Sequence, residues 1–280
     1  MQGYMNSTIE QILKGSYDLH VHAAPDIEER RLDVLEVARE AYEAEMAGLV
    51  LKSNYYPTTS LAYVLGQMYP GLNVYGAITL NHSVGGLNPS AVQTAGKLGT
   101  KIVWLSDYES NWDRDEEGSN PNRPLLDDAG EINCNVRTML KVIKDNDMVL
   151  ASGDISPSET IQLFETARSF GITNMIASNS SLSASLDEQM EMISLGARLE
   201  YTFLSCMPSD TKLSVTDFAK MLGKVGIEHC IISTDLGQWM NPTPVEGMRM
   251  AIASMLAEGM SEAEVSLLVK YNPAKILGAG

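Results

Sequence analysis

Short apolar runs alternate with longer amphipathic stretches along almost the whole chain. The apolar runs are continuous, with few polar residues interspersed, a pattern typical of parallel strands that are covered on both faces. The pattern predicts eight strands, at residues 17–23, 48–53, 73–80, 101–106, 148–153, 174–178, 198–204 and 229–235.

The amphipathic stretches predict helices, because their apolar residues recur with the period of a helix. Several begin with a capping box, such as Ser156-Pro157-Ser158-Glu159, and glycines at 48, 171, 196 and 226 follow predicted helices as C-caps do. A short helix leads the chain, and further helices are predicted at 31–47, 58–69, 89–98, 135–146, 157–170, 186–195, 215–225, 245–258 and 262–271.

Eight strand-then-helix units predict a (β/α)8 TIM-type barrel, since right-handed crossovers between eight parallel strands close the sheet and leave no edge. A doubly wound open sheet is the alternative. We expect one domain over residues 1–280, because no repeat or linker marks a boundary. The long polar stretch 107–130 is then a loop over the C-terminal face, with Trp112 as a lid residue; a solvated surface insertion is the alternative.

The composition is that of a soluble globular protein, with 44% hydrophobic and 20% charged residues among 280. The net charge of -16 argues against nucleic acid or an anionic membrane as a partner, because both require clustered basic residues. We therefore expect a small-molecule substrate, and whether the chain forms a homo-oligomer stays open. Three cysteines without close pairing, and no leader-like or membrane-spanning apolar run, predict a reduced, cytoplasmic protein.

The segment Asp18-Leu19-His20-Val21-His22 carries the clearest chemical signal. Side chains two residues apart on a strand point to the same face, so His20 and His22 present two imidazole nitrogens to one metal ion. The alternative is a pair of histidines that only hydrogen-bond near the end of a strand.

Polar residues follow the apolar strands, at the end where a barrel carries its active site. Asp235 ends the last strand, where a carboxylate needs a cation or strong donors, and a metal held by the first strand would serve. Its alternative role is to cap the turn before Gly237. Lys52 follows the second strand and is a candidate catalytic residue; its alternative role is a structural ion pair with a neighbouring carboxylate. The other polar residues that follow strands include Asn54, Tyr55, Asn81, His82, Asp154 and Asn179.

Three motifs together resemble the amidohydrolase superfamily of metal-dependent hydrolases. They are the His-x-His of the first strand, Ser233-Thr234-Asp235 on the last strand, and YNPAKILG at 271–278. The order of elements matches over nearly the whole chain, and the strings GLVLKSNYYPT, NHSVGGLNP and STDLGQ look like a divergent branch of amidohydrolase-like barrels. The resemblance implies that His20, His22 and Asp235 bind a divalent metal.

The chain departs from the superfamily pattern after the fifth and sixth strands. Members often place histidines there, whereas this chain has Asp154 and Asn179, and no lysine ends the fourth strand to bridge two metals. The resemblance therefore implies one divalent ion, zinc with manganese or iron as alternatives, bound by His20, His22, Asp235 and Asp154.

By the same resemblance, a metal-activated water hydrolyses a small amide, cyclic amide or lactone, and Asp235 acts as general base and then acid. Lys52 or His82 steadies the developing oxyanion. The residues expected to orient the substrate are Asn54, Tyr55, Asn81, Asn179 and Trp112.

Two other functions stay open. The DLHVH opening also resembles PHP-type phosphoesterases, although that family uses many histidines and this chain has four. A barrel that kept its pocket but lost the metal would be a non-catalytic small-molecule binder, since fold is no proof of function.

Overall fold

The structure is a computed structural model that describes residues 2–105, 125–127, 129–178, 183–210 and 213–279. Most of the predicted loop at 107–130, with Trp112, lies outside the described residues, and so does Asn179. The lid role of that loop therefore stays a prediction.

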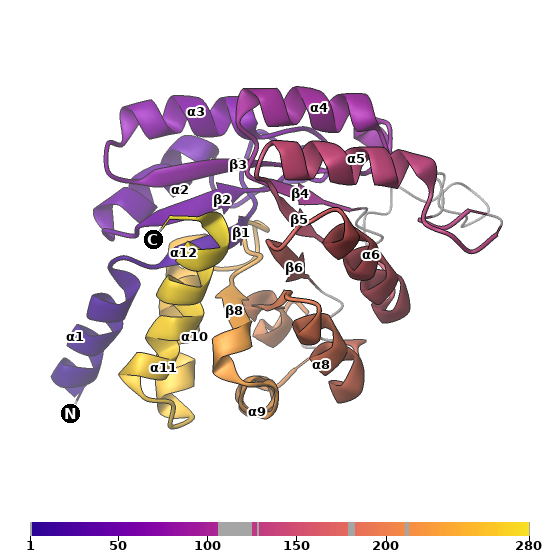
Figure 1. The fold of residues 1–280 in the computed structure, drawn as a ribbon. Coiled ribbons are helices and arrows are strands. Elements are labelled where there is room, and N and C mark those ends of the chain that lie inside the picture. The colour runs from indigo at the N-terminus through magenta and orange to yellow at the C-terminus, as the bar shows by residue number, and fades with distance from the viewer. Residues whose placement is uncertain (1, 106–124, 128, 179–182, 211–212, 280) are drawn as a thin grey trace. The chain divides into compact units, whose positions relative to one another are not determined.

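All eight predicted strands are confirmed, and they form one parallel sheet in the sequential order β1 to β8 (Figure 1). With a helical segment after each strand, this is the (β/α)8 TIM-type fold that the sequence predicts. Each strand is shorter than the apolar run that predicts it. In several of the runs, the last residues are polar and lie beyond the end of the strand. The strands are β1 (Tyr17–Val21), β2 (Gly48–Leu51), β3 (Asn73–Thr79), β4 (Ile102–Trp104), β5 (Val149–Ala151), β6 (Met175–Ala177), β7 (Arg198–Thr202) and β8 (Cys230–Ser233).

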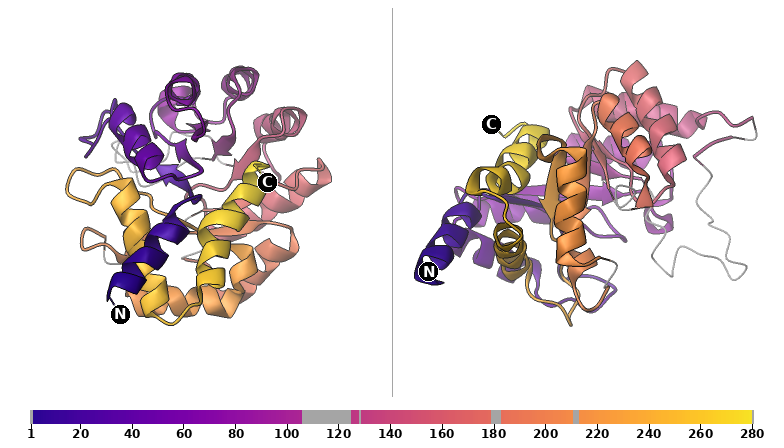
Figure 2. Two further views of the ribbon diagram at one scale, coloured as in Figure 1. Left: turned by 90° about the vertical axis from the view of Figure 1, so that its left-hand side faces the viewer. Right: turned by 90° about the horizontal axis from the view of Figure 1, so that it is seen from below.

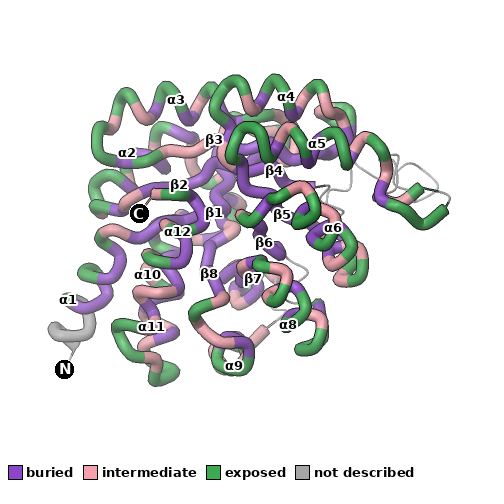
Figure 3. The backbone as a smooth tube through the Cα atoms, in the orientation of Figure 1, coloured by how far each residue is buried: buried purple, intermediate pink, exposed green. Residues whose placement is uncertain are grey.

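The helices bury one side and expose the other, as the amphipathic pattern predicts (Figure 3). They are α1 (Gln2–Leu13), α2 (Val34–Glu43), α3 (Thr59–Met68), α4 (Pro89–Leu98), α5 (Cys134–Asp145), α6 (Pro157–Ser169), α8 (Leu186–Ser194), α9 (Val215–Val225), α10 (Pro244–Ala257), α11 (Glu262–Ser266) and α12 (Asn272–Leu277). Short helical turns lie at η1 (His82–Val84), η2 (Phe203–Cys206), η3 (Ile227–His229) and η4 (Leu267–Tyr271). None of these described helices combines the length and apolar character that a membrane crossing needs.

The chain divides into two compact units. Unit 1 holds residues 1–51, 61–75 and 201–280, and unit 2 holds residues 52–60 and 76–200. In unit 1, α1 packs against α10 and α11 (Figure 2), and in unit 2, α4 packs along α5. The expectation of a single domain over the whole chain stays a prediction.

Each unit has an apolar interior built from its strands. In unit 1, Leu19 of β1 and Ile231 of β8 are fully buried, and in unit 2 the same holds for Val103 of β4 and Leu150 of β5. Burying one such side chain contributes about 1.5 to 3 kcal/mol to folding. Continuous burial of β4, β5 and β8 explains why the sequences of these three strands lack a polar face.

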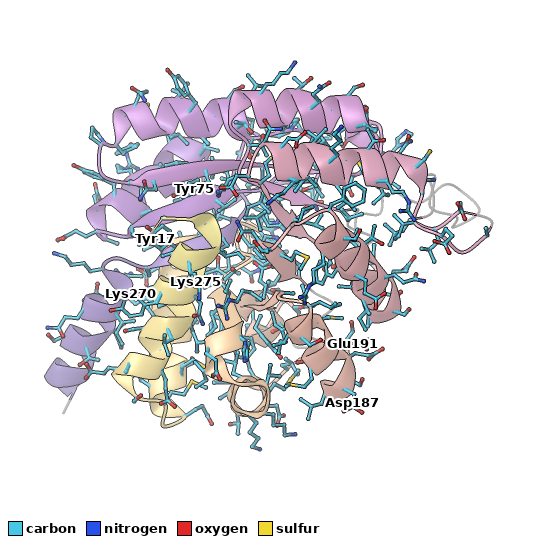
Figure 4. All side chains as sticks on the ribbon, in the orientation of Figure 1. Tyr17, Tyr75, Asp187, Glu191, Lys270 and Lys275 are labelled. Carbon is cyan, nitrogen blue, oxygen red and sulfur yellow. The ribbon has the colours of Figure 1, made fainter. Side chains whose placement is uncertain are left out.

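Gly48 does not cap a helix, and that prediction was wrong. Helix α2 ends before it, and Glu45 takes the left-handed conformation with φ of 53°. Gly48 opens β2 instead, where a Cβ would lie 2.6 Å from the Asn73 carbonyl oxygen and 2.9 Å from the ring of Tyr17. Tyr17 lies near Tyr75 at this end of unit 1 (Figure 4). Gly48 is therefore required by close packing rather than by a turn.

Candidate metal centre

Asp18 and His20 lie on β1 and His22 directly follows the strand, so the three residues occupy alternating positions of the chain. All three residues are buried, with 1% of Asp18, 1% of His20 and 4% of His22 exposed. The two imidazole ring centroids lie 5.2 Å apart. The common face predicted for the two histidines is thus present in unit 1.

Asp235 follows β8 and turns its carboxylate toward both imidazoles. Its Oδ1 lies 3.1 Å from Nε2 of His20 and 3.2 Å from Nε2 of His22. Its backbone is left-handed, with φ of 55°, and its N–H donates to the His20 carbonyl oxygen at 2.9 Å. The side chain of Asp235 is 15% exposed, so the group is open to solvent at this one residue.

These three residues fit a divalent metal by donor chemistry and by spacing. Among the described residues, they form the one group of three or more His, Cys, Asp or Glu side chains that could hold a metal ion. Their ligand atoms lie within 4.8 Å of one another. Zinc binds imidazole nitrogen and carboxylate oxygen at about 2.0 to 2.2 Å, which places neighbouring ligand atoms about 3 to 3.5 Å apart. Three protein ligands with a further position open to water is the pattern of catalytic zinc sites.

The Asp18 carboxylate is hydrogen-bonded to Thr234, the residue that follows β8. Its Oδ2 accepts from the Thr234 hydroxyl at 2.5 Å, and its Oδ1 accepts from the Thr234 N–H at 3.0 Å and the His20 N–H at 3.2 Å. Burial raises the pKa of Asp18 to about 7, while these hydrogen bonds and the nearby His20 act to lower it. The sequence analysis missed this pair, although Asp18 shares its strand face with His20.

Gly237 is a second supporting residue that the sequence analysis did not assign. A Cβ at this position would lie 2.0 Å from the His22 carbonyl oxygen, and the φ of Gly237 is 147°. Its own carbonyl oxygen accepts from the Arg31 N–H at 2.8 Å. The close approach of Gly237 to His22 therefore requires a residue without a side chain.

Several of the predicted site residues belong to unit 2. Lys52 is 3% exposed, and its Nζ lies 5.5 Å from the centroid of the Trp104 ring, a cation–π contact. The buried Asn81 donates through Nδ2 to the Asn54 carbonyl oxygen at 3.1 Å. This bond joins the segments that follow β2 and β3, so Asn54 and Asn81 are brought together.

The remaining predicted residues of unit 2 are partly or fully exposed. His82 is exposed in the turn η1, Tyr55 is half-buried with its N–H donating to the Ser53 hydroxyl at 3.1 Å, and Asp154 is half-buried after β5. The catalytic role of His82 and Lys52, the metal-binding role of Asp154 and the substrate-binding roles stay predictions.

The fold is shared with solved structures of low sequence identity. An amidohydrolase from Pseudomonas aeruginosa is 11% identical, with a TM-score of 0.68 over 97% of this chain and 98% of that chain. The probable dipeptidase PvdM from Pseudomonas aeruginosa is 11% identical, with a TM-score of 0.67 over 100% of this chain and 99% of that chain. A phosphotriesterase homology protein from Escherichia coli, complexed with phosphate, is 13% identical, with a TM-score of 0.64 over 94% and 99%.

These matches confirm at the level of fold the resemblance to amidohydrolase-type barrels that the three motifs indicate. No curated protein sequence matches the chain. A family model does match, over residues 15–200, and it is described as a family of unknown function, DUF6282. Since that match spans more than half of the chain, the protein belongs to the DUF6282 family.

Proposed function

We propose that this protein is a metal-dependent hydrolase that acts on a small-molecule amide, cyclic amide or lactone. The observation that carries the proposal is the convergence of His20, His22 and Asp235, with Oδ1 of Asp235 within 3.2 Å of both imidazole Nε2 atoms. The solved structures that share the fold include proteins named as an amidohydrolase and a dipeptidase, which favours hydrolysis over other chemistries.

His20, His22 and Asp235 would hold one divalent ion, zinc in our proposal, with Asp154 as a fourth ligand. When bound, the ion polarises the scissile carbonyl group and lowers the pKa of water toward about 7. Asp235 is the residue that takes the proton of the attacking water and passes it to the leaving group, because its carboxylate is the exposed member of the three.

The proposal also gives roles to residues that follow other strands. Lys52 or His82 would stabilise negative charge that develops on the substrate oxygen. Asn81, held by its bond to the Asn54 carbonyl oxygen, has a fixed side chain with which to orient a substrate. The other residues that we propose to orient the substrate are Asn54, Tyr55, Asn179 and Trp112.

We also propose a cytoplasmic location. The cysteines are free thiols, as a reducing compartment maintains them: Cys134, Cys206 and Cys230.

The net charge of -16 favours a small-molecule partner over nucleic acid.

Hydrolysis of a panel of small amides, cyclic amides and lactones by the metal-free and the zinc-loaded protein tests the proposal. We expect turnover of at least one class by the loaded protein, and a loss of about a hundredfold or more in the His22→Ala and Asp235→Asn variants. Asp187→Asn, which removes an exposed carboxylate on α8, is the control and should retain full activity (Figure 4).

Two results would contradict the proposal. Failure of the protein to bind zinc or manganese would remove its chemical basis. Tight metal binding with no turnover across the panel would instead favour a non-catalytic small-molecule binder, and hydrolysis of phosphate esters alone would favour a phosphoesterase.

A further inference from the structure

The backbone of Asp235 is left-handed, which is unfavourable for a residue with a Cβ, so the surroundings must stabilise it. Its own N–H bond to the His20 carbonyl oxygen, at 2.9 Å, ties one side of the peptide. The residues on either side of Asp235 are held by a second set of bonds, and these lead to Asp18.

We propose that Asp18 is a positioning residue that fixes the left-handed turn at Asp235 and so sets its carboxylate against the two imidazoles. The proposal concerns the geometry of the metal ligands and rests on the proposed function only in assuming that they bind a metal.

The bonds form a directed chain that spans both neighbours of Asp235. The Leu236 N–H donates to the Thr234 hydroxyl oxygen at 3.3 Å, and the Thr234 hydroxyl donates to Asp18 Oδ2 at 2.5 Å. The Thr234 N–H donates to Asp18 Oδ1 at 3.0 Å. The residues before and after Asp235 are therefore both tied, directly or through one hydroxyl, to one carboxylate of β1.

The same carboxylate also accepts from the His20 N–H, at 3.2 Å. Asp18 thus contacts the backbone of one metal ligand and the residue preceding another. Thr234 and Asp18 are both buried, with 0% and 1% exposed, so water does not replace these bonds.

A carboxylate suits this position better than an amide because every bond that it makes is accepted. An asparagine has one acceptor oxygen for the two N–H groups and would turn its NH2 group toward the Thr234 hydroxyl. That hydroxyl would then have two donors facing it, the NH2 group and the Leu236 N–H, and no acceptor for its own proton.

Three variants test the proposal through metal binding and ligand geometry rather than through activity. Thr234→Val removes the hydroxyl and keeps the side-chain shape, Thr234→Ser keeps the hydroxyl, and Asp18→Asn keeps the size of the side chain. The control is Ser233→Ala, the adjacent residue of β8, which is fully buried and whose hydroxyl has no hydrogen-bond partner among the described residues.

We expect Thr234→Val and Asp18→Asn to weaken zinc binding, measured by competition with a chromophoric chelator, by about 10-fold to 100-fold, the range seen for residues that orient metal ligands. The visible absorption spectrum of the cobalt-loaded proteins should change in band position and intensity. Thr234→Ser should bind zinc within about twofold of the wild-type affinity and should keep the wild-type cobalt spectrum. Ser233→Ala should leave both the zinc affinity and the spectrum unchanged.

Folded Thr234→Val protein that binds zinc as tightly as wild type, with the same cobalt spectrum, would overturn the proposal. A crystal structure of this variant gives a second readout that needs no metal, and a retained φ near 55° at Asp235 would also overturn it. If Asp18→Asn fails to fold, the zinc affinity and the cobalt spectrum of Thr234→Val decide whether the proposal holds. Wild-type protein without metal affinity would contradict the proposed function instead, and the crystal structure would still decide the positioning role.

Discussion

Asp235 has a left-handed backbone, which lowers stability, and a carboxylate that faces two imidazoles, which can bind a metal. Asparagine adopts the left-handed conformation at a lower energetic cost than alanine does. We expect both Asp235→Asn and Asp235→Ala to weaken metal binding, because both remove the carboxylate ligand. Metal-free Asp235→Ala should unfold with a free energy about 1 kcal/mol lower than metal-free Asp235→Asn, as measured by urea denaturation. Equal stability of the two variants would show that the backbone strain is absent.

Gly237 offers a second test at the residue scale. In Gly237→Ala the new Cβ would meet the His22 carbonyl oxygen at 2.0 Å, so the backbone beside a metal ligand must move. We expect a loss of about 2 to 3 kcal/mol in the free energy of unfolding, together with weaker zinc binding.

The control for this variant is Gly196→Ala. Gly196 has a φ of 94° but nothing within 4 Å of an added Cβ, so alanine there adds backbone strain without a clash. It should cost about 1 kcal/mol and leave zinc affinity unchanged. Equal zinc affinity in both variants would argue against a supporting role for Gly237.

The convergence of His20, His22 and Asp235 was predictable from sequence, and the residues that support this convergence were not. His20 and His22 share a strand face by simple alternation, and a carboxylate at the end of an apolar strand needs a partner. The roles of Asp18 and Gly237 depend on contacts with residues more than two hundred positions away, Thr234 and His22 respectively. No local pattern reports a contact across that separation.

At the scale of elements, strands and helix starts were predictable because local chemistry sets them. The capping boxes at Ser156, Ser185 and Ser261 are all present, and Asn88 caps α4 with Pro89 at its first position.

The end of the last predicted helix, at 271, was wrong. The chain passes through the π-helical turn η4 and continues as α12 to Leu277. Pro273 lacks an N–H and normally ends a helix, so the sequence suggests a stop there. A widened turn before Pro273 lets the helical path go on instead.

Helix α6 supplies the test of an element boundary. Ser156 accepts from the Glu159 N–H at 3.3 Å, and Glu159 accepts in return from the Ser156 N–H at 3.1 Å. We expect Ser156→Ala to lower the free energy of unfolding by about 1 kcal/mol, measured by chemical denaturation. Ser158→Ala, the same change inside the first turn, removes the hydroxyl that lies 3.2 Å from the Ser156 hydroxyl but keeps both bonds of the capping box, so it should cost less than half as much. Equal losses would mean that the cap does not stabilise the helix.

At the scale of the whole molecule, metal binding should raise stability, since an ion that binds only the folded state shifts the unfolding equilibrium. A free zinc concentration a hundredfold above the dissociation constant adds about 2.7 kcal/mol. In a chain of this size that corresponds to an increase of about 5 °C or more in Tm. Chelation should reverse the increase in wild type, and His22→Ala should show neither change. An equal shift in His22→Ala would place the bound metal elsewhere.

The central claim is that His20, His22 and Asp235 bind one catalytic metal ion. Elemental analysis of protein purified without chelator tests it most directly, with the His20→Ala and Asp235→Ala variants prepared in parallel. The account predicts about one equivalent of a divalent metal in wild type and its loss in both variants. Wild-type protein that carries no metal and takes up neither zinc nor manganese, or variants that retain the full equivalent, would contradict it.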